Sequence, residues 1–323
     1  MSIIQFIKNW SLPIAMITGA LSYFIYSNIP ALAPTKPFVT SLISFLQPIL
    51  IFAMLFITFC KISLNDLRPK MWHLWLLLIQ SGSFALLTLC IAFFPEITGR
   101  VIIEGAMLCM ICPTATAATV IAGKLGGNTT SLTSYIILIN IVTAIVIPIF
   151  IPLIHSHHGM TFVTSFSMIL AKVFPLLLCP LITAMMLRKW FPSIHGVILQ
   201  CKDLAFYIWL VALAIAIALT TRSIVHSHVP MVYQFGIAGI SLVCCALQFF
   251  IGKRIGAHYH DEISAGQSLG QKNTIFAIWL AYTFMTPITS IAGGFYSIWH
   301  NLYNSYQLYQ MRKQQGSERK SEP

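Results

Sequence analysis

The sequence predicts an all-α membrane protein that crosses the bilayer many times. Of its 323 residues, 57% are hydrophobic and only 8% are charged, whereas a soluble globular domain carries about 25% charged residues. The apolar residues gather into runs of about 20, the length that a helix needs to span a bilayer. Because the charged residues lie mainly in the short segments between these runs, a polytopic bundle of membrane-spanning helices is expected.

Ten apolar segments are long enough to be transmembrane helices. Their expected limits are 11–29, 39–60, 72–94, 101–123, 130–153, 163–187, 204–221, 231–251, 264–284 and 287–308. The first is expected to be a helix rather than a signal peptide, because its apolar run exceeds the roughly 7–15 residues of a signal sequence. Short loops leave no room for a soluble insertion, so residues 1–310 are expected to form one transmembrane domain.

The basic residues predict the orientation. If the chain begins inside, only Lys36, Arg100 and Arg222 fall in outer loops, Lys172 and Lys272 lie within spans, and the other 14 of the 19 Lys and Arg residues are inside. Loops rich in Lys and Arg face the cytoplasm. Both termini are therefore expected to be cytoplasmic. The net charge of +11 is explained by this orientation, and no nucleic-acid partner is expected.

Two segments outside the spans have a pattern of their own. The connection 188–203 alternates aromatic and apolar residues with polar ones, which predicts a short helix at the membrane interface. The last residues, 311–323, are basic and polar, and we expect a solvated, disordered cytoplasmic tail.

The ten spans divide into two halves of five, residues 1–153 and 163–310. Because five is odd, the second half would run through the membrane in the opposite direction. The fourth and ninth spans hold equivalent places in the two halves, and both are interrupted by polar or small residues. Matching interruptions in inverted repeats indicate the binding site of a secondary transporter. Two crossed, discontinuous helices are therefore expected.

The interruption of the fourth span begins at Pro113, within Cys112-Pro113-Thr114-Ala115-Thr116. Proline cannot donate to the helix ladder and crowds the preceding turn, so a break or kink is expected there. The threonines that follow either satisfy freed carbonyls or face a cavity. A simple kink between packed helices is the alternative, but the matching interruption in the ninth span favours a site.

The ninth span carries a lysine at membrane depth, within Ser268-Leu269-Gly270-Gln271-Lys272-Asn273. An ionisable group there costs about 2.5–3.5 kcal/mol on insertion scales, so Lys272 is expected to have a partner or a task. Gly270 weakens the helix at the same level, and Asn273 adds an amide. A charge, a weak point in a helix and an amide together predict a site that lines a cavity.

The chain resembles the bile acid:sodium symporter family over residues 10–309. Members of that family carry Cys-Pro-Gly-Gly-Thr-Ala-Ser-Asn in the fourth helix, which Cys112-Pro113 and Thr116-Ala117 match. They also carry a glutamine in the third helix, which Gln80 matches. The resemblance implies the crossed-helix architecture that this family shares with sodium/proton antiporters. A bacterial member would lie in the inner membrane.

The family's sodium motifs are degenerate in this sequence. Ala118 and Thr119 occupy the Ser-Asn positions of the fourth helix. The ninth helix of the family reads Glu-x-Gly-x-Gln-Asn, and here Ser268 replaces the glutamate and Lys272 the glutamine. The residues that match this motif are Gly270 and Asn273.

These departures bear on the coupling ion. In the family, Glu, Gln, Ser and Asn side chains hold two sodium ions. The corresponding ion-coupling candidates here are Gln80, Thr119, Ser268, Gln271 and Lys272. None is a carboxylate, and an ammonium offers three donors and no acceptor to a cation. Sodium coupling as in the family is therefore not expected, and neither is a metal or another cofactor.

Our hypothesis is that the Lys272 ammonium takes the place of a sodium ion, held by Gln80, Thr119 and carbonyls at a helix end. Three roles for this lysine remain open. It is a fixed structural charge at the C-terminal end of a half-helix, it couples transport to protons by losing its own, or it serves an uncoupled exchange.

The expected function is alternating-access transport of an organic anion, either bile-acid-like or a small carboxylate. The predicted substrate-binding residues are Thr114, Thr116, Lys272 and Asn273. An intramembrane enzyme would need a nucleophile, base or metal set at depth, and the spans contain no such grouping, so no enzymatic activity is expected. The alternative is a ligand-sensing membrane protein on the same fold that does not transport. The expected partners are the anion and the lipid bilayer, and the oligomeric state stays open.

Overall fold

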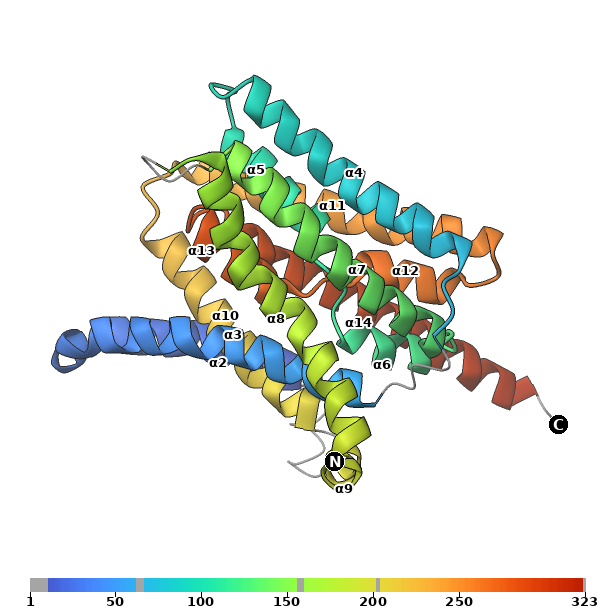
Figure 1. Cartoon of the computed structure of the whole chain (residues 1–323). Helices are drawn as coiled ribbons and strands as arrows, with labels where there is room; N and C mark the ends of the chain where they lie inside the picture. The colour runs from blue at the N-terminus through green and yellow to red at the C-terminus, as the bar shows by residue number, and fades with distance from the viewer. Residues whose placement is uncertain (1–10, 62–66, 156–159, 202–203, 322–323) are drawn as a thin grey trace.

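The computed structural model describes residues 11–61, 67–155, 160–201 and 204–321, and these contain helices and no β-strand (Figure 1). The start of the predicted first half, residues 1–10, and the last two residues of the predicted tail lie outside the described residues. The elements are α2 (Ser11–Asn28), η1 (Pro30–Thr35), α3 (Lys36–Cys60), α4 (Met71–Phe93), α5 (Arg100–Ile111), α6 (Ala117–Lys124), α7 (Thr129–Phe150), η3 (Ile151–Leu153), α8 (Phe162–Trp190), α9 (Pro192–Gln200), α10 (Leu204–Val225), α11 (Met231–His258), α12 (Glu262–Gly270), α13 (Thr274–Phe284) and α14 (Ser290–Ser321).

The described helices have the lengths and composition of a membrane protein. Six of them are long and apolar enough to cross a bilayer. The longer ones also expose large apolar side chains, such as Phe45, Leu86 and Phe235, as expected for helices whose outer faces meet lipid rather than water. The prediction of an all-α polytopic membrane protein is confirmed at this level.

The two interruptions expected from the sequence are breaks in the structure. The fourth predicted span is divided into α5, which ends at Ile111, and α6, which begins at Ala117. The ninth is divided into α12, which ends at Gly270, and α13, which begins at Thr274. Each half-helix is too short to cross a bilayer by itself.

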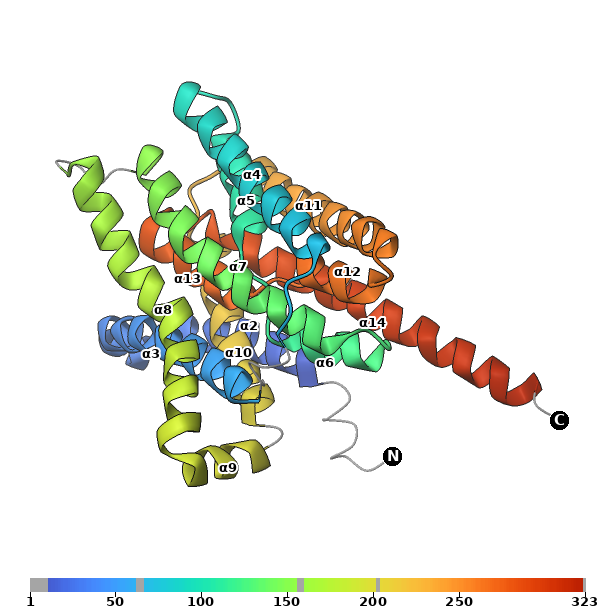
Figure 2. The same cartoon turned by 45° about the vertical axis from the view of Figure 1, so that its right-hand side comes forward.

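The helices pack in two groups (Figures 1 and 2). One group consists of α2, α3, α8 and α10. The other consists of α4, α5, α6, α7, α11, α12, α13 and α14. Within the first group α2 and α10 approach closely at Gly19, where an added Cβ would lie 2.3 Å from the carbonyl oxygen of Ala214. The groups meet where α8 packs against α7, and where α3 and α10 contact α13 and α14.

Two segments outside the predicted spans are helical. The short helix expected within 188–203 is present as α9, Pro192–Gln200. The expectation of a disordered tail is wrong as far as Ser321, because α14 continues through residues 311–321. The segment is rich in Met, Arg, Lys, Gln and Glu, which have high helix propensity, so the last helix extends beyond its apolar part.

Candidate functional site

The two broken helices meet at their breaks. Thr114 and Lys272 form an isolated antiparallel bridge. The amide of Ala115 donates to the carbonyl of Gln271 at 2.9 Å, and the amide of Asn273 donates to the carbonyl of Pro113 at 2.8 Å. Non-helical backbone at membrane depth must find hydrogen-bond partners inside the protein. Each break supplies them to the other, so the two interruptions form a single structural unit.

Side chains satisfy the free carbonyls at the C-terminal end of α5. Gln80 of α4 donates from Nε2 to the carbonyls of Ile111, at 3.1 Å, and Cys112, at 2.9 Å. Gln248 of α11 donates to the carbonyl of Cys109 at 3.3 Å. A helix end leaves such carbonyls without partners, so α4 and α11 cap α5 from two directions.

Lys272 completes this cap. Its Nζ lies 3.5 Å from the carbonyl oxygen of Met110, and the residue is only 1% exposed. The ammonium therefore lies at the negative end of the α5 helix dipole, where a cation is stabilised. Of the partners expected for Lys272, the structure shows one helix-end carbonyl. The hydrogen bonds of Gln80 and Thr119, the two side chains expected to hold it, go to other groups.

The C-terminal end of α12 is capped in a similar way. Tyr296 of α14 donates from its hydroxyl to the carbonyl of Gly270 at 2.8 Å. Thr114 donates from Oγ1 to the carbonyl of Ser268. Gln248 Nε2 in turn donates to the Tyr296 hydroxyl at 3.1 Å. The ends of both half-helices therefore belong to one buried hydrogen-bond network.

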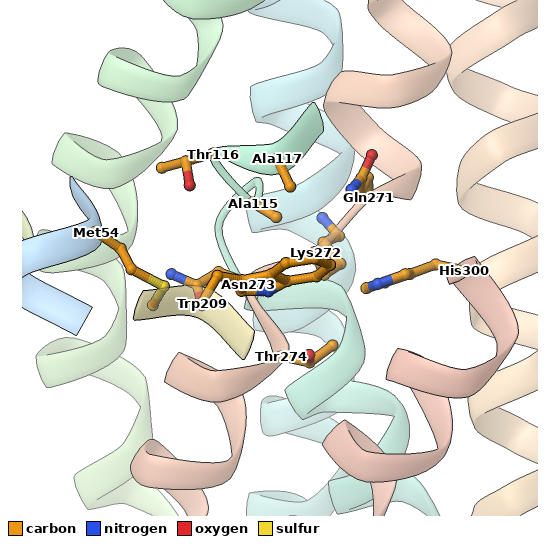
Figure 3. A pocket seen from close by; sticks show the side chains of 10 residues that line it. All are labelled: Met54, Ala115, Thr116, Ala117, Trp209, Gln271, Lys272, Asn273, Thr274 and His300. Carbon is orange, nitrogen blue, oxygen red and sulfur yellow. The ribbon is translucent and has the colours of Figure 1, made fainter. Parts of the chain in front are cut away.

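A small cavity, which we call the central cavity, lies beside the breaks (Figure 3). Its volume is about 10 Å³, roughly the room that one water molecule requires. It lies between the two helix groups, since Met54 of α3 and Trp209 of α10 face the breaks across it. Its lining residues are Met54, Ala115, Thr116, Ala117, Trp209, Gln271, Lys272, Asn273, Thr274 and His300.

The N-termini of two half-helices border the central cavity. At α13, the Asn273 side chain accepts a hydrogen bond from the amide of Phe276 at 3.2 Å. At α6, Thr116 forms no side-chain cap within the described structure. The amides of Ala118 and Thr119 at this end bond to the carbonyls of Ala115 and Thr116. Among the described lining residues Lys272 carries the ionisable amine and none is a carboxylate, which favours an anion over a cation.

The structure brings three of the four predicted substrate-binding residues together. Thr116, Lys272 and Asn273 line the central cavity. Thr114 is fully buried and is not part of the lining, because its side chain and backbone fasten the two breaks together.

The predicted ion-coupling residues are more dispersed. Gln271 lines the cavity with Lys272. Gln80 caps α5, and its Oε1 accepts from the Tyr135 hydroxyl at 3.1 Å, so its oxygen faces away from the α5 end. The Thr119 hydroxyl donates to the carbonyl of Thr116 one turn earlier. Ser268 Oγ is buried and has no partner among the described residues.

Sequence reasoning missed Met54, Trp209 and His300. A signal for His300 exists, because Ser297, His300, Asn304 and Gln307 recur at helical spacing in the last span and so share one face. Met54 and Trp209 lie in apolar runs with no such signal. Their place at the cavity follows from tertiary packing alone.

Glu104 lies in the second turn of α5 and does not line the central cavity. Its carboxylate accepts from Arg100 Nε at 2.9 Å and from Thr289 Oγ1 at 2.9 Å, and His155 Nε2 lies 3.2 Å away. These contacts tie the start of α5 to the end of η3 and to the turn before α14. Within the described part of the chain, no group of three or more His, Cys, Asp or Glu residues is arranged to hold a metal ion.

Comparison of the sequence with models of known protein families, and with curated proteins, found no match for this chain.

Proposed function

We propose that this chain is a secondary transporter of an organic anion, built from ten membrane-spanning segments in two inverted repeats and resembling the bile acid:sodium symporters. The observation that carries the proposal is the pair of broken helices joined by the Thr114–Lys272 bridge, with a cavity between two helix groups beside it. Paired discontinuous helices are the construction that transporters use to expose backbone and charge at membrane depth.

A repeated Gln–Tyr pair supports the inverted repeats. In the first half, Tyr135 of α7 hydrogen-bonds to Gln80 of α4 at 3.1 Å. In the second half, Gln248 of α11 hydrogen-bonds to Tyr296 of α14 at 3.1 Å. These helices are the third and fifth of each proposed half, and each pair caps a half-helix. Two related repeats are expected to have the same Gln–Tyr hydrogen bond between equivalent helices.

The position of the central cavity supports alternating access. It lies between the two helix groups and has room for about one water molecule, so the conformation described is closed around it. An organic anion would enter when the groups separate, by rigid-body movement of one group against the other. The substrate would contact Thr116, Lys272 and Asn273, with His300 as a further partner.

The contacts of Lys272 support its place as a tethered cation. Its ammonium lies against a helix-end carbonyl beside the carbonyls that Gln80 caps, at a position where the family that the chain resembles binds sodium. A fixed positive charge there would satisfy the α5 end without an ion from solution. We therefore propose transport that does not depend on sodium.

Thermal unfolding of purified protein in sodium, potassium or choline chloride tests the tethered cation, with wild type and Lys272→Gln compared. A ligand that binds only the folded state raises stability by mass action. Wild type is expected to show no preference for sodium. The Gln variant, which restores the family residue and removes the charge, is expected to gain a sodium-specific rise in Tm. A sodium-specific rise in wild type would contradict the proposal.

Uptake into proteoliposomes tests transport itself, with a panel of one conjugated bile acid and several small carboxylates. Sodium-independent uptake of at least one anion is expected. A pH gradient imposed on wild type and Lys272→Gln separates proton coupling from the two other roles of the lysine, because only coupling makes the response depend on Lys272. Binding without uptake of any anion would favour the ligand-sensing alternative.

A further inference from the structure

Two buried polar stripes face each other between α12 and α14. Gln267 and Gln271 are four residues apart on the α12 segment, and His300 and Asn304 are four apart on α14, so each pair lies on one side of its helix. All four are between 1% and 3% exposed. We call these four residues the α12–α14 seam.

The seam holds an unusual number of unsatisfied atoms. Gln267 Oε1, Gln271 Oε1, His300 Nδ1 and Asn304 Nδ2 are all buried, with no hydrogen-bond partner among the described residues. The direct contacts of the seam are bonds to Asn304 Oδ1, from Gln267 Nε2 at 2.9 Å and from Gln307 Nε2 at 3.2 Å. Each amide has both an acceptor oxygen and a donor nitrogen that require partners.

Leaving these atoms unpaired is energetically expensive. An unsatisfied buried polar group costs about 1–3 kcal/mol, and proteins normally avoid that cost through another protein group or an ordered water. Buried waters are found where two to four polar partners converge. The seam offers donors and acceptors at successive levels, so its chemistry fits water better than an apolar ligand or a single ion.

The seam also has a direction. Its first level, Gln271 and His300, lines the central cavity. The second level, Gln267 and Asn304, lies one turn farther from the break along both helices, and Gln307 follows it on α14. The path therefore leads from the cavity toward the side where α12 begins, which holds Asp261 and Lys70.

We propose that the α12–α14 seam binds a file of water molecules that connects the central cavity with this side of the protein. The file would let water leave and enter the cavity while the two helix groups remain closed. Water trapped in the cavity when the groups close around an anion could leave by this route. This role in transport rests on the proposed function, whereas the hydration of the seam does not.

Radiolytic hydroxyl-radical labelling of the protein in lipid nanodiscs tests the water file, with oxidation of each residue measured by mass spectrometry. Radicals formed from bound water oxidise buried side chains beside it. His73 is a matched internal control. It is 1% exposed, but its Nδ1 accepts from the Lys70 amide at 3.0 Å and its Nε2 lies 3.5 Å from Ser131 Oγ. His300 is expected to oxidise several-fold faster than His73.

The variant Gln267→Leu/Asn304→Leu should slow the oxidation of His300 toward the rate of His73. Asn140→Leu is the control variant, because Asn140 is an equally buried amide on α7 outside the seam, and it should leave the His300 rate unchanged. Equal rates for His300 and His73 in wild type would overturn the proposal, even if the double variant failed to fold. Labelling requires no substrate, so it tests the hydration of the seam whether or not the protein transports an anion. A seam without water and a lack of transport can therefore be told apart.

Discussion

At the scale of single residues, Asp261 fixes the start of a half-helix. Its Oδ2 accepts from Lys70 Nζ at 2.7 Å and from Trp72 Nε1 at 3.2 Å, which ties the turn before α12 to the start of α4. Burial by itself raises the pKa of this carboxyl. The hydrogen bonds from Lys70, Ser264 and Ser131 outweigh burial and hold the pKa below its usual value.

Asp261→Asn should therefore lower the stability of the fold at neutral pH, and the stability of the variant should fall less than that of wild type as the pH is lowered. A carboxyl whose pKa is lower in the folded than in the unfolded state stabilises the fold at pH values above the unfolded pKa, which is about 3.9. This contribution is lost as the pH falls through the lower pKa of the folded state. The expected loss is about 1 kcal/mol, because Lys70 remains 40% exposed and regains water. Thermal unfolding between neutral and acid pH measures it. Glu262→Gln, at the exposed neighbour, is the control, and an equal loss in both variants would contradict the role of Asp261.

At the scale of elements, both helix breaks are predictable from the sequence because their causes are local. Pro113 cannot continue a helix, and Gly270 and Asn273 weaken the second one. The partners of the breaks are not predictable in the same way. Gln248 and Tyr296 reach the half-helix ends from distant parts of the chain, and nothing near them in sequence indicates those contacts.

The packing of α11 against α12 depends on glycine, and this gives a prediction. Gly252 and Gly256 face α12, and a Cβ at Gly252 would lie 2.6 Å from the carbonyl oxygen of Ala265. Small residues four apart allow such close approach in membranes. Gly252→Ala should cost about 1–3 kcal/mol, as overpacking typically does. Gly239→Ala on the same helix meets no atom within 4 Å and should cost nothing. Thermal unfolding of both variants tests this prediction. If Gly252→Ala were as stable as Gly239→Ala, α11 and α12 would be able to move apart at no cost.

At the scale of the whole molecule, the succession of helices follows from hydrophobic runs, but the cavity does not. Thr116, Lys272 and Asn273 carry a polar signal that predicts their place. Met54 and Trp209 come from the other helix group, and an apolar residue facing a cavity has the same sequence pattern as one facing lipid. The helical end of α14 is not predictable for a related reason, because a polar, charged segment has the composition of a disordered tail as well as of a solvated helix.

The contact between α10 and α14 should control movement between the two helix groups. A Cβ at Gly294 would lie 2.9 Å from the Cβ of Thr220, so a cysteine pair at these positions needs only a small shift to reach the roughly 3.5–4.5 Å of a disulfide. Oxidation of Thr220→Cys/Gly294→Cys should abolish anion uptake, and reduction should restore it.

The matched control pair is Ala277→Cys/Gly293→Cys. Its Cβ atoms would be 3.3 Å apart, but it joins α13 to α14 within one helix group and should leave uptake intact. Mass spectrometry of the cross-linked peptides distinguishes the designed pairs from bonds to native cysteines. If transport requires the groups to separate, only the pair between groups can stop it. Full uptake by the oxidised Thr220→Cys/Gly294→Cys protein would mean that α10 and α14 move together, and the boundary between the moving parts would then lie elsewhere.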